Sequence, residues 1–410
     1  MPQDRAPDNA PWLNARRLRA QGLALAVCLW GIYAWVLATP GLRDRDHLLK
    51  GTDFIHFYTL GSLALEHRGE ALYDMRAQTE LLGRRVPEAA ATRYLPLYGP
   101  QVSLLFAPLA KLPYAYALAA WWFISADIYA LCLFLIWSTC PTLRHRAGLV
   151  FLLALAYPAF WHLIAWGQTS APALACFTAA YLLLLRGRGF AAGLALGCLA
   201  FKPQLAIAAA VIFLLTGAGR ILLGALLAAA AQLFVGWLYY GTATMRDYVA
   251  HLLQIPQVTA LLEPRLYQTH CLRTFWQMLI PWPVAPVPVY IVTAIIVLAV
   301  TFRCWRSSLP LALRYSALLL ASVLVSPHLT VYDLVILAPA LLLLADWLLS
   351  NPSAPEHGHI ATLSYLTYVL PLIGFTARWT HVQLSVIAMA GLLWILARLP
   401  VGRLPERRAA

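Results

Sequence analysis

Polar residues able to do chemistry stand at the ends of hydrophobic runs in this chain of 410 residues. A charged side chain next to hydrocarbon is costly, so such residues usually serve a function. A carboxylate there is a candidate reactive group, and an isolated lysine is a candidate for binding an anion such as phosphate. The set consists of Asp53 in GTDFIHFYTLG, Gln168 in WGQTS, Lys202 in FKPQ, and His328 and Asp333 in SPHLTVYD.

Each of these residues also has an ordinary structural interpretation. Asp53 suits the N-cap of a following helix, where Asp is favoured, and Gln168 can satisfy a helix end. Lys202 has no acidic neighbour in sequence, and its ammonium group can reach the interface by snorkelling. His328 can make a structural hydrogen bond in a loop, with Asp333 either as its partner or as a cap of the next helix. The sequence leaves both interpretations of each residue open.

The composition places these residues in an integral membrane protein. Hydrophobic residues make up 61% of the chain and charged residues 11%, far from the roughly one-quarter charged share of soluble domains. The apolar runs are unbroken rather than alternating, which favours helices over a β-barrel. The net charge of +13 is typical of nucleic-acid binders. The arginines, however, fall in small groups at the ends of apolar runs, so we interpret them as topology markers and expect no nucleic-acid partner.

The seven cysteines are an odd set that lies mostly within apolar segments and shows no C-x-x-C spacing. We therefore expect neither a metal site nor a disulfide framework. A cysteine buried in a helix usually acts as a small hydrophobe. The residues are Cys28, Cys132, Cys140, Cys176, Cys198, Cys271 and Cys304.

Hydrophobic length predicts an all-α polytopic fold with twelve crossings in a single membrane domain, 1–410. Two of the twelve, 189–201 and 204–216, are short for a core about 30 Å thick. Because Lys202-Pro203-Gln204 lies between them, one broken helix is the alternative. The predicted spans are 22–40, 113–138, 147–165, 169–185, 189–201, 204–216, 221–240, 287–302, 310–326, 331–348, 359–376 and 382–400.

The basic groups predict an orientation, because positive loops stay on the cytoplasmic side. With twelve crossings, six arginine groups at the ends of apolar runs all fall on the same side as the N-terminus. No removable signal peptide is expected, since a basic stretch precedes a first run long enough to span. Both termini are then cytoplasmic, and the candidate residues face outward. The groups are Arg16/Arg17/Arg19, Arg144/Arg146, Arg186/Arg188, Arg220, Arg303/Arg306 and Arg403/Arg407/Arg408.

Two predicted outer segments are longer than ordinary loops. Segment 41–112 holds the Asp53 motif and apolar residues at helical spacing, which indicates interfacial helices. Segment 241–286 mixes aromatic residues, prolines and charges, Glu263 and Arg273 among them. Both lie on one predicted face, where they can build a shallow domain together.

The order of these motifs resembles glycosyltransferase family 87, polytopic membrane enzymes typified by polyprenyl-phosphate-mannose-dependent mannosyltransferases of the GT-C type. The resemblance covers about residues 20 to 350. One departure is Tyr94-Leu95-Pro96, where the family commonly has Tyr-Pro-Pro. The matching pieces are TDFIHFY, Gly69 with Leu72-Tyr73-Asp74, YLPLY at 94–98, Gly167-Gln168, Gly193 and Gly197 before Lys202-Pro203-Gln204, and Ser326-Pro327-His328 with Tyr332-Asp333.

This resemblance implies transfer of a sugar, with mannose expected and arabinose or glucose also compatible. The donor would be a polyprenyl-phosphate-linked sugar and the acceptor a glycolipid or glycan outside a bacterial inner membrane, with no nucleotide and no metal cofactor. It implies that Asp53 is the general base of an inverting reaction. The remaining predicted donor-binding residues are Lys202 and Arg93 as cations for the phosphate, with His328, Tyr58, Tyr94, Trp166, Gln168 and Asp333.

A transporter or flippase of a lipid-linked sugar is the competing class, because many crossings, intramembrane Gly and Pro, and an isolated Lys202 also suit transporters. The large charged outer segments and the lack of a repeat between the two halves favour the enzyme.

Overall fold

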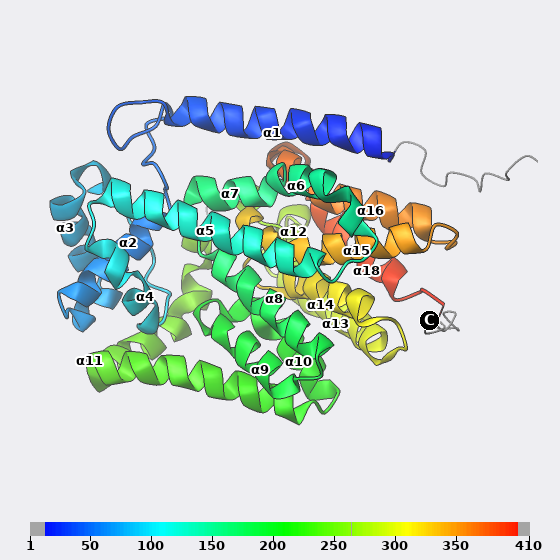
Figure 1. Cartoon of the computed structure of the whole chain (residues 1–410). Coiled ribbons are helices and arrows are strands. Elements are labelled where there is room, and N and C mark those ends of the chain that lie inside the picture. The colour runs from blue at the N-terminus through cyan, green and yellow to red at the C-terminus, as the bar shows by residue number, and fades with distance from the viewer. Residues whose placement is uncertain (1–12, 264, 401–410) are drawn as a thin grey trace, which may run out of the picture.

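The computed structural model describes residues 13–263 and 265–400, and for residues 256–262 the backbone alone. Within these residues the chain is helical, and its β contacts are two isolated bridges, Arg43 with Leu49 and Thr269 with Thr330. The all-α prediction is confirmed (Figure 1). The α-helices are α1 (Ala15–Leu37), α2 (Phe54–Leu65), α3 (Met75–Arg85), α4 (Gln101–Ala110), α5 (Tyr114–Trp137), α6 (Ala147–Leu155), α7 (Pro158–Trp166), α8 (Ser170–Leu185), α9 (Gly189–Gly197), α10 (Ile207–Leu215), α11 (Gly219–Leu262), α12 (Leu272–Leu279), α13 (Pro286–Arg306), α14 (Leu311–Val325), α15 (Ala338–Ser350), α16 (His357–Val369), α17 (Ala377–Thr380) and α18 (Leu384–Leu396).

Among the described residues, six helical stretches are long and apolar enough to cross a membrane. A bent pair, Leu143–Leu155 with Pro158–Trp166, makes a seventh if its 48° bend is counted within one span. Each predicted crossing lies mainly on helix, but several of these helices are shorter than 18 residues, so the predicted count of twelve is not confirmed. The six are Ala15–Leu37, Tyr114–Trp137, Gly219–Ile255, Pro286–Arg306, Val331–Ser350 and His357–Thr380.

The segment around Lys202 enters the helical bundle and returns. Helix α9 continues as a 3-10 turn, η4 (Cys198–Phe201), and a second turn, η5 (Pro203–Ala206), leads into α10. The start of α9 contacts the start of α11, because a Cβ on Gly189 would lie 3.4 Å from Cγ1 of Ile221. Since the chain enters and leaves this segment at the same end, the alternative of one broken crossing is wrong, and Lys202 lies at the tip of a helical hairpin.

Small residues let the first arm of this hairpin pack closely on α11. A Cβ added to Gly193 would lie 2.0 Å from the carbonyl oxygen of Ile221, and one on Gly197 would lie 2.2 Å from that of Ala225. Such spacing of small residues allows helix backbones to approach within a membrane. The glycines that contribute to the family resemblance therefore have a packing role that holds the hairpin in place.

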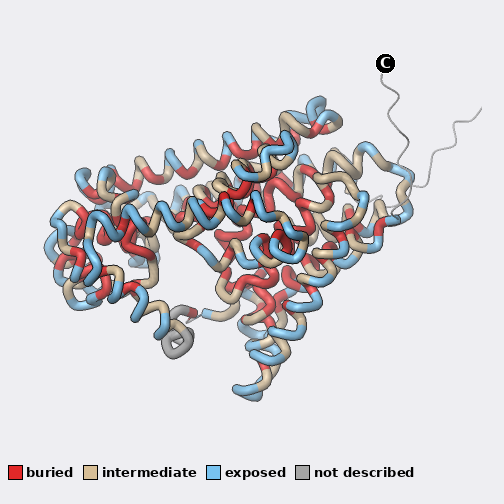
Figure 2. Tube along the Cα trace, turned by 90° about the horizontal axis from the view of Figure 1, so that it is seen from below, coloured by how far each residue is buried: buried red, intermediate tan, exposed pale blue. Residues whose placement is uncertain are grey.

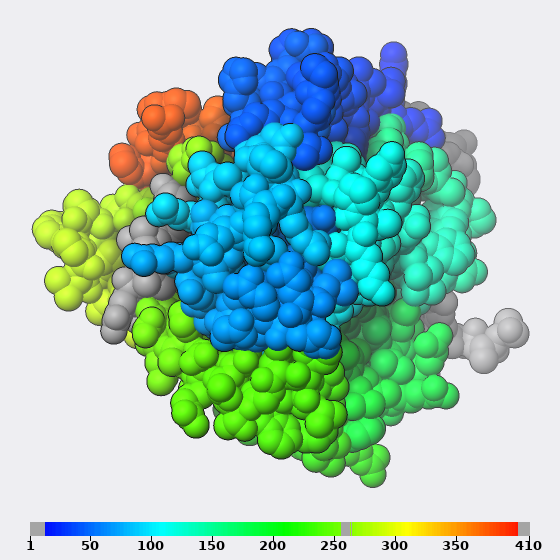
Figure 3. All heavy atoms as spheres, turned by 90° about the vertical axis from the view of Figure 1, so that its left-hand side faces the viewer, coloured from blue at the N-terminus to red at the C-terminus, as the bar shows by residue number. Residues whose placement is uncertain are grey.

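The two long segments predicted to lie outside pack on each other at one end of the molecule, named here the α2 end. Gly241, at φ 81°, kinks α11 where the predicted span 221–240 ends. Beyond the kink, Tyr248 joins a buried cluster with residues of α2, α3 and the turn η1 (Gly69–Tyr73). The Tyr239 hydroxyl donates to the carbonyl of Ala64 at 2.9 Å. Figure 3 shows this face, with α2–α4 in the middle and α11 below them.

The main hydrophobic core lies between α5, α7, α8, α10, α14, α15 and α18. Helix α14 is buried along most of its length, whereas α1 buries only Gly22, Ala26 and Leu29. Figure 2 shows buried stretches in the middle of the molecule and also at the α2 end. The predicted polar tails, 1–15 and 401–410, with Arg403, Arg407 and Arg408, fall largely outside the described residues.

Candidate functional site

Asp53 lies in the connection between α1 and α2, directly before the first residue of α2. Asp53 occupies the N-cap position of α2, but its side chain makes no capping hydrogen bond, so the interpretation of its carboxylate as a helix cap is wrong. Its backbone N–H instead donates to the carbonyl of Trp166 at 2.9 Å, at the end of α7. The carboxylate is therefore placed by a tertiary contact and not by the helix that follows it.

A glycine turn after α7 brings Gln168 to this carboxylate. Gly167 has φ 66°, and a Cβ there would lie 2.6 Å from Cβ of Phe54. The indole N–H of Trp121 donates to the Gly167 carbonyl at 3.0 Å and holds the turn. Gln168 then donates from Nε2 to Oδ2 of Asp53 at 2.6 Å. Gln168 thus fixes the carboxylate instead of merely satisfying a helix end.

The surroundings of Asp53 make it a weaker acid than an exposed aspartate. Burial raises the pKa of its carboxyl to about 6, and the negative charge of Asp333 acts in the same direction. The hydrogen bond from Gln168 and the positive charge of Lys202 oppose this rise. A carboxylate with a pKa in this range is ionised at neutral pH and is a stronger base than ordinary aspartate.

Lys202 and Asp333 form a buried ion pair. The Lys202 ammonium lies 2.8 Å from Oδ1 of Asp333 and 3.0 Å from Oγ of Ser170, and Ser170 donates to the same Oδ1 at 2.5 Å. Lys202 is 3% exposed, so the snorkelling interpretation is wrong. Asp333 also forms a capping box with Thr330 at the turn η7 (Val331–Leu337), as the cap interpretation predicts. The lysine therefore has an acidic partner that its local sequence does not reveal.

A second polar cluster surrounds His328. Its Nδ1 lies 2.6 Å from Oε1 of Glu263, and Arg273 pairs with the other oxygen of Glu263 and donates to the Pro327 carbonyl. The partner of His328 is thus Glu263, and the predicted alternative of an Asp333 partner is wrong. Desolvation raises the pKa of Glu263, but the hydrogen bonds from His328 and Arg273 outweigh it and hold that pKa below its usual value.

In the sequence, Glu263 and Arg273 stand out only as charges of the second long segment. The signal that could have singled them out is the rarity of acids, because the chain has 17 Asp and Glu residues against 30 Lys and Arg residues. A carboxylate that becomes buried needs a cationic partner. Their pairing with His328 depends on tertiary structure, which local spacing does not reveal.

The aromatic candidates separate into two groups. Tyr94 lies at the Asp53 loop, because its hydroxyl donates to the Thr52 carbonyl, and Trp166 packs edge-on against Tyr332 at a ring distance of 5.6 Å. Tyr58 is instead 4% exposed, and its hydroxyl donates to the Leu112 carbonyl at 2.9 Å. It therefore belongs to the buried aromatic cluster that α2 forms with α4 and α5. The predicted contact of Tyr58 with the donor is not supported by this placement.

Two further residues of the first long segment have unused polar groups. Arg93 is exposed and makes no hydrogen bond or ion pair with any described residue. His56 is buried, its ring lies 5.0 Å from that of Tyr94, and neither ring nitrogen has a partner within the described part of the chain. Unsatisfied buried polar groups cost free energy and are frequent at functional sites.

An apolar cavity of about 410 Å³ adjoins the site. Its lining includes Thr169, which lies between Gln168 and Ser170, and Phe201, which precedes Lys202. Gln101, about nine-tenths buried, also lines it, and neither atom of its side-chain amide has a partner among the described residues. The cavity offers an apolar ligand a position beside Thr169 and Phe201. The remaining lining residues are Val102, Leu105, Phe106, Pro172, Ala231, Gln232 and Val235.

No group of three or more His, Cys, Asp or Glu side chains suited to holding a metal ion is found within residues 13–263 and 265–400. All seven cysteines are free thiols.

The fold and the site together define a polytopic helical membrane protein that gathers an acid, an ion pair and an acid-bound histidine near the α2 end. The model of glycosyltransferase family 87 matches residues 97–327, more than half of the chain. The chain therefore belongs to glycosyltransferase family 87 and is a membrane glycosyltransferase. The match confirms the predicted resemblance. The match includes Gln168 and Lys202 and ends one residue before His328. No curated protein and no solved structure matches the chain.

Proposed function

We propose that this glycosyltransferase moves a hexose, with mannose as the first candidate, from a polyprenyl-phosphate-linked donor to a hydroxyl of a glycolipid or glycan. The observation that carries the proposal is the Asp53 carboxylate, with its pKa near 6, held by Gln168 and within electrostatic reach of Lys202. Gln168 occupies Oδ2, and no described residue forms a hydrogen bond to Oδ1. That oxygen is available to an acceptor hydroxyl.

In the proposed reaction Asp53 is the general base. The acceptor oxygen forms a bond to the anomeric carbon, its proton passes to the Asp53 carboxylate, and the bond from that carbon to the phosphate oxygen breaks. The products are the glycosylated acceptor and the lipid monophosphate. A single displacement inverts the anomeric centre and needs no second carboxylate as nucleophile. Asp333 does not compete for that role, because its Oδ1 is bound by Lys202 and Ser170.

The departing phosphate needs cationic or hydrogen-bonding groups. Lys202 uses two of its three donors inside the protein, on Ser170 and Asp333, which leaves one for the phosphate. His328, whose side chain is 31% exposed, has its Nδ1 on Glu263 and keeps Nε2 for a ligand. Arg93 supplies an exposed guanidinium without a protein partner. We assign the phosphate to these three residues.

The apolar cavity beside Thr169 and Phe201 supports a lipid-linked donor. A polyprenyl chain is apolar throughout, so it gains free energy on leaving water for such a lining. A soluble nucleotide sugar would gain nothing there. We place the first isoprene units in this cavity and the phosphate at its Lys202 end.

We further propose that the α2 end faces the periplasm or cell exterior of a bacterial inner membrane, with both termini cytoplasmic. The basic groups Arg144/Arg146 and Arg186/Arg188 support this orientation, because basic loops favour the cytoplasmic side. The reaction is expected to proceed without a metal ion.

The test is transfer of radiolabelled mannose from polyprenyl-phosphate-mannose to membrane glycolipid by purified protein, with a chelator present. We expect transfer by the wild type and a fall of about 10²-fold or more in Asp53→Asn. Asp46→Asn is the matched control, since Asp46 is an exposed aspartate of the same loop, and it should retain activity.

Parallel assays with the arabinose and glucose donors identify the sugar. The proposal fails if no polyprenyl-phosphate donor is used, or if Asp53→Asn and Asp46→Asn are equally active. Movement of a lipid-linked sugar across liposomes without any transfer would instead support the transporter.

A further inference from the structure

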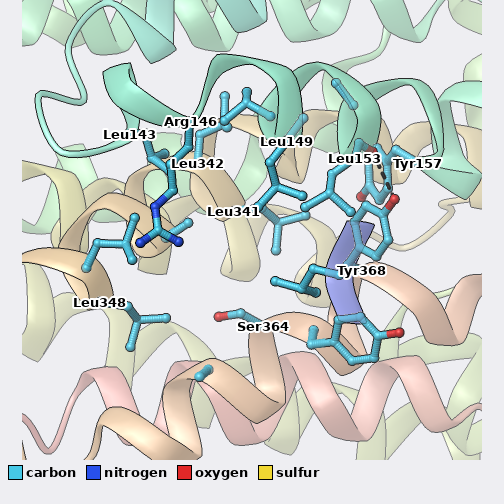
Figure 4. Close-up of a pocket in the computed structure, with 18 of the residues that line it drawn as sticks. Leu143, Arg146, Leu149, Leu153, Tyr157, Leu341, Leu342, Leu348, Ser364 and Tyr368 are labelled. Atoms are coloured by element: carbon cyan, nitrogen blue, oxygen red, sulfur yellow. Dashed lines mark hydrogen bonds between the residues drawn. The ribbon is translucent and has the colours of Figure 1, made fainter. Parts of the chain in front are cut away.

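A second cavity, of about 290 Å³, lies away from the candidate site. It is bounded by the first turn of α1, the second half of α5, α6, α15 and α16 (Figure 4). Helix α5 connects the two places. The Tyr114 hydroxyl at its start donates to the Lys50 carbonyl in the Asp53 loop, whereas Tyr129 and Leu133 line the second cavity. At 1.5 Å per residue these positions are roughly 20–30 Å apart along the helix.

The wall of this cavity is hydrocarbon, and its size suits part of an acyl chain. Leucines from four helices face it, among them Leu149, Leu341 and Leu348. Its volume lies at the lower end of the roughly 300–1,000 Å³ of ligand pockets. Burial of apolar chain surface in such a lining is favourable because it removes that surface from water.

Two polar groups of the cavity have no partner among the described residues. Arg146 extends its guanidinium into the open space between α6 and α16, as Figure 4 shows, and makes no hydrogen bond or ion pair there. The hydroxyl oxygen of Ser364, on α16, is buried and equally without a partner. An arginine suits phosphate because its planar fork of donors matches phosphate oxygens.

Arginines predominate around the cavity, although Glu356, whose Oε2 is buried without a partner among the described residues, directly precedes the lining residue His357. Exposed Arg16, Arg17 and Arg19 belong to the first turns of α1, whose residues Ala15 and Leu18 line the cavity. Asp346 follows the lining residue Ala345 on α15, but its carboxylate already accepts hydrogen bonds from the backbone N–H groups of Thr142 and Leu143. Basic pockets between transmembrane helices favour anionic lipid headgroups.

We propose that this cavity binds one anionic diacyl phospholipid, with its phosphate on Arg146 and Ser364 and an acyl chain among the leucines. The site is separate from the transfer reaction and does not rest on the function proposed above. The lipid would fill the space between α1, α6 and α16, and so join α1, which buries few residues of its own, to the rest of the bundle.

The test is native mass spectrometry of the purified full chain titrated with dioleoyl phosphatidylglycerol or dioleoyl phosphatidylcholine. We expect one phosphatidylglycerol to bind about tenfold or more tighter than phosphatidylcholine, and Arg146→Gln to remove that preference. Arg144→Gln is the matched control. It removes the same charge two residues away, but Arg144 donates to the Ser138 carbonyl at 2.6 Å and does not line the cavity.

A second variant tests the apolar part. Ala361→Phe fills the cavity from α16 and should weaken both lipids, while soluble glycerol phosphate at millimolar concentration should not compete. The proposal is overturned if the two lipids bind equally to the wild type, if Arg144→Gln and Arg146→Gln weaken phosphatidylglycerol alike, if Ala361→Phe leaves binding unchanged, or if glycerol phosphate competes. Thermal unfolding and gel filtration establish that each variant is folded.

Discussion

The side-chain amide of Gln168 lies 2.6 Å from Oδ2 of Asp53, although 115 residues separate them in the chain. The contact joins the turn after α7 to the loop before α2, which the hydrogen bond from the Asp53 N–H to the Trp166 carbonyl also connects. Because Gln168 donates to the carboxylate, it stabilises the ionised form and lowers the pKa of Asp53 from the higher value that burial alone would give.

The first prediction concerns the pH dependence of transfer. A base must be ionised to act, so kcat/KM should rise with pH and level off above about 6, the pKa of Asp53. Gln168→Met removes the hydrogen-bond donor to Asp53 and should move the rising limb of the pH–rate profile to higher pH. Activity at pH 8 should be less affected than activity at pH 6. The pH–rate profiles of both proteins provide the measurement. An unchanged limb in Gln168→Met would mean that another group controls it.

The second prediction concerns stability. The pKa of Asp53 is raised on folding, so its contribution to stability is fully present below about pH 4 and is lost as the pH rises through about 6. Asp53→Asn carries no charge and avoids that loss, so the inactive variant should unfold at a higher temperature than the wild type at pH 8. At pH 8 the free energy of unfolding of Asp53→Asn should exceed that of the wild type by an amount of the order of 1–3 kcal/mol. This difference should vanish near pH 4. Thermal scans in detergent at both pH values test this, and a variant less stable at pH 8 would contradict it.

Sequence patterns predicted the helices and the polar residues of the site, because length, hydrophobicity and charge are local properties. Tertiary packing decided what the patterns could not reveal. Lys202 pairs with a buried acid, Asp333, 131 residues away in the chain. Tyr58 belongs to the Asp53 motif, but its side chain packs in the aromatic core. The predicted number of crossings is not confirmed, because helices such as α9 and α10 are short arms of a hairpin whose position depends on contacts with α11 and α14.

The third prediction separates the structural from the catalytic role of Lys202. Lys202→Met leaves the Asp333 carboxylate buried without its cation, which should cost about 3–5 kcal/mol of stability. Adding Asp333→Asn removes the uncompensated charge and should restore most of the unfolding temperature. If Lys202 also holds the donor phosphate, the folded double variant will still transfer sugar at least tenfold more slowly. Recovery of both stability and transfer would assign Lys202 a purely structural role.

The fourth prediction assigns Glu263 a positioning role through His328. Glu263→Gln weakens the hydrogen bond that orients the imidazole and should lower kcat about tenfold or more. In a double-mutant cycle, His328→Ala combined with Glu263→Gln should be no slower than His328→Ala alone, because the glutamate acts through the histidine. Gln277→Ala is the control, since it removes the other side-chain partner of Arg273 and leaves the Glu263–His328 contact in place. Additive losses in the cycle would show that Glu263 acts independently.

The fifth prediction concerns the glycine turn that brings Gln168 to Asp53. Gly167 and Gly187 both have left-handed backbones, at φ 66° and 68°, but only Gly167 is crowded, since a Cβ would lie 2.6 Å from Cβ of Phe54 and nothing lies within 4 Å at Gly187. Gly187→Ala should therefore cost only the backbone strain, about 1–2 kcal/mol, and retain transfer. Gly167→Ala must also push the loop carrying Asp53 away from the turn, so it should lose more stability and most of its activity. Equal stability and equal transfer rates in the two variants would show that the close approach of Gly167 to Phe54 does not position the carboxylate.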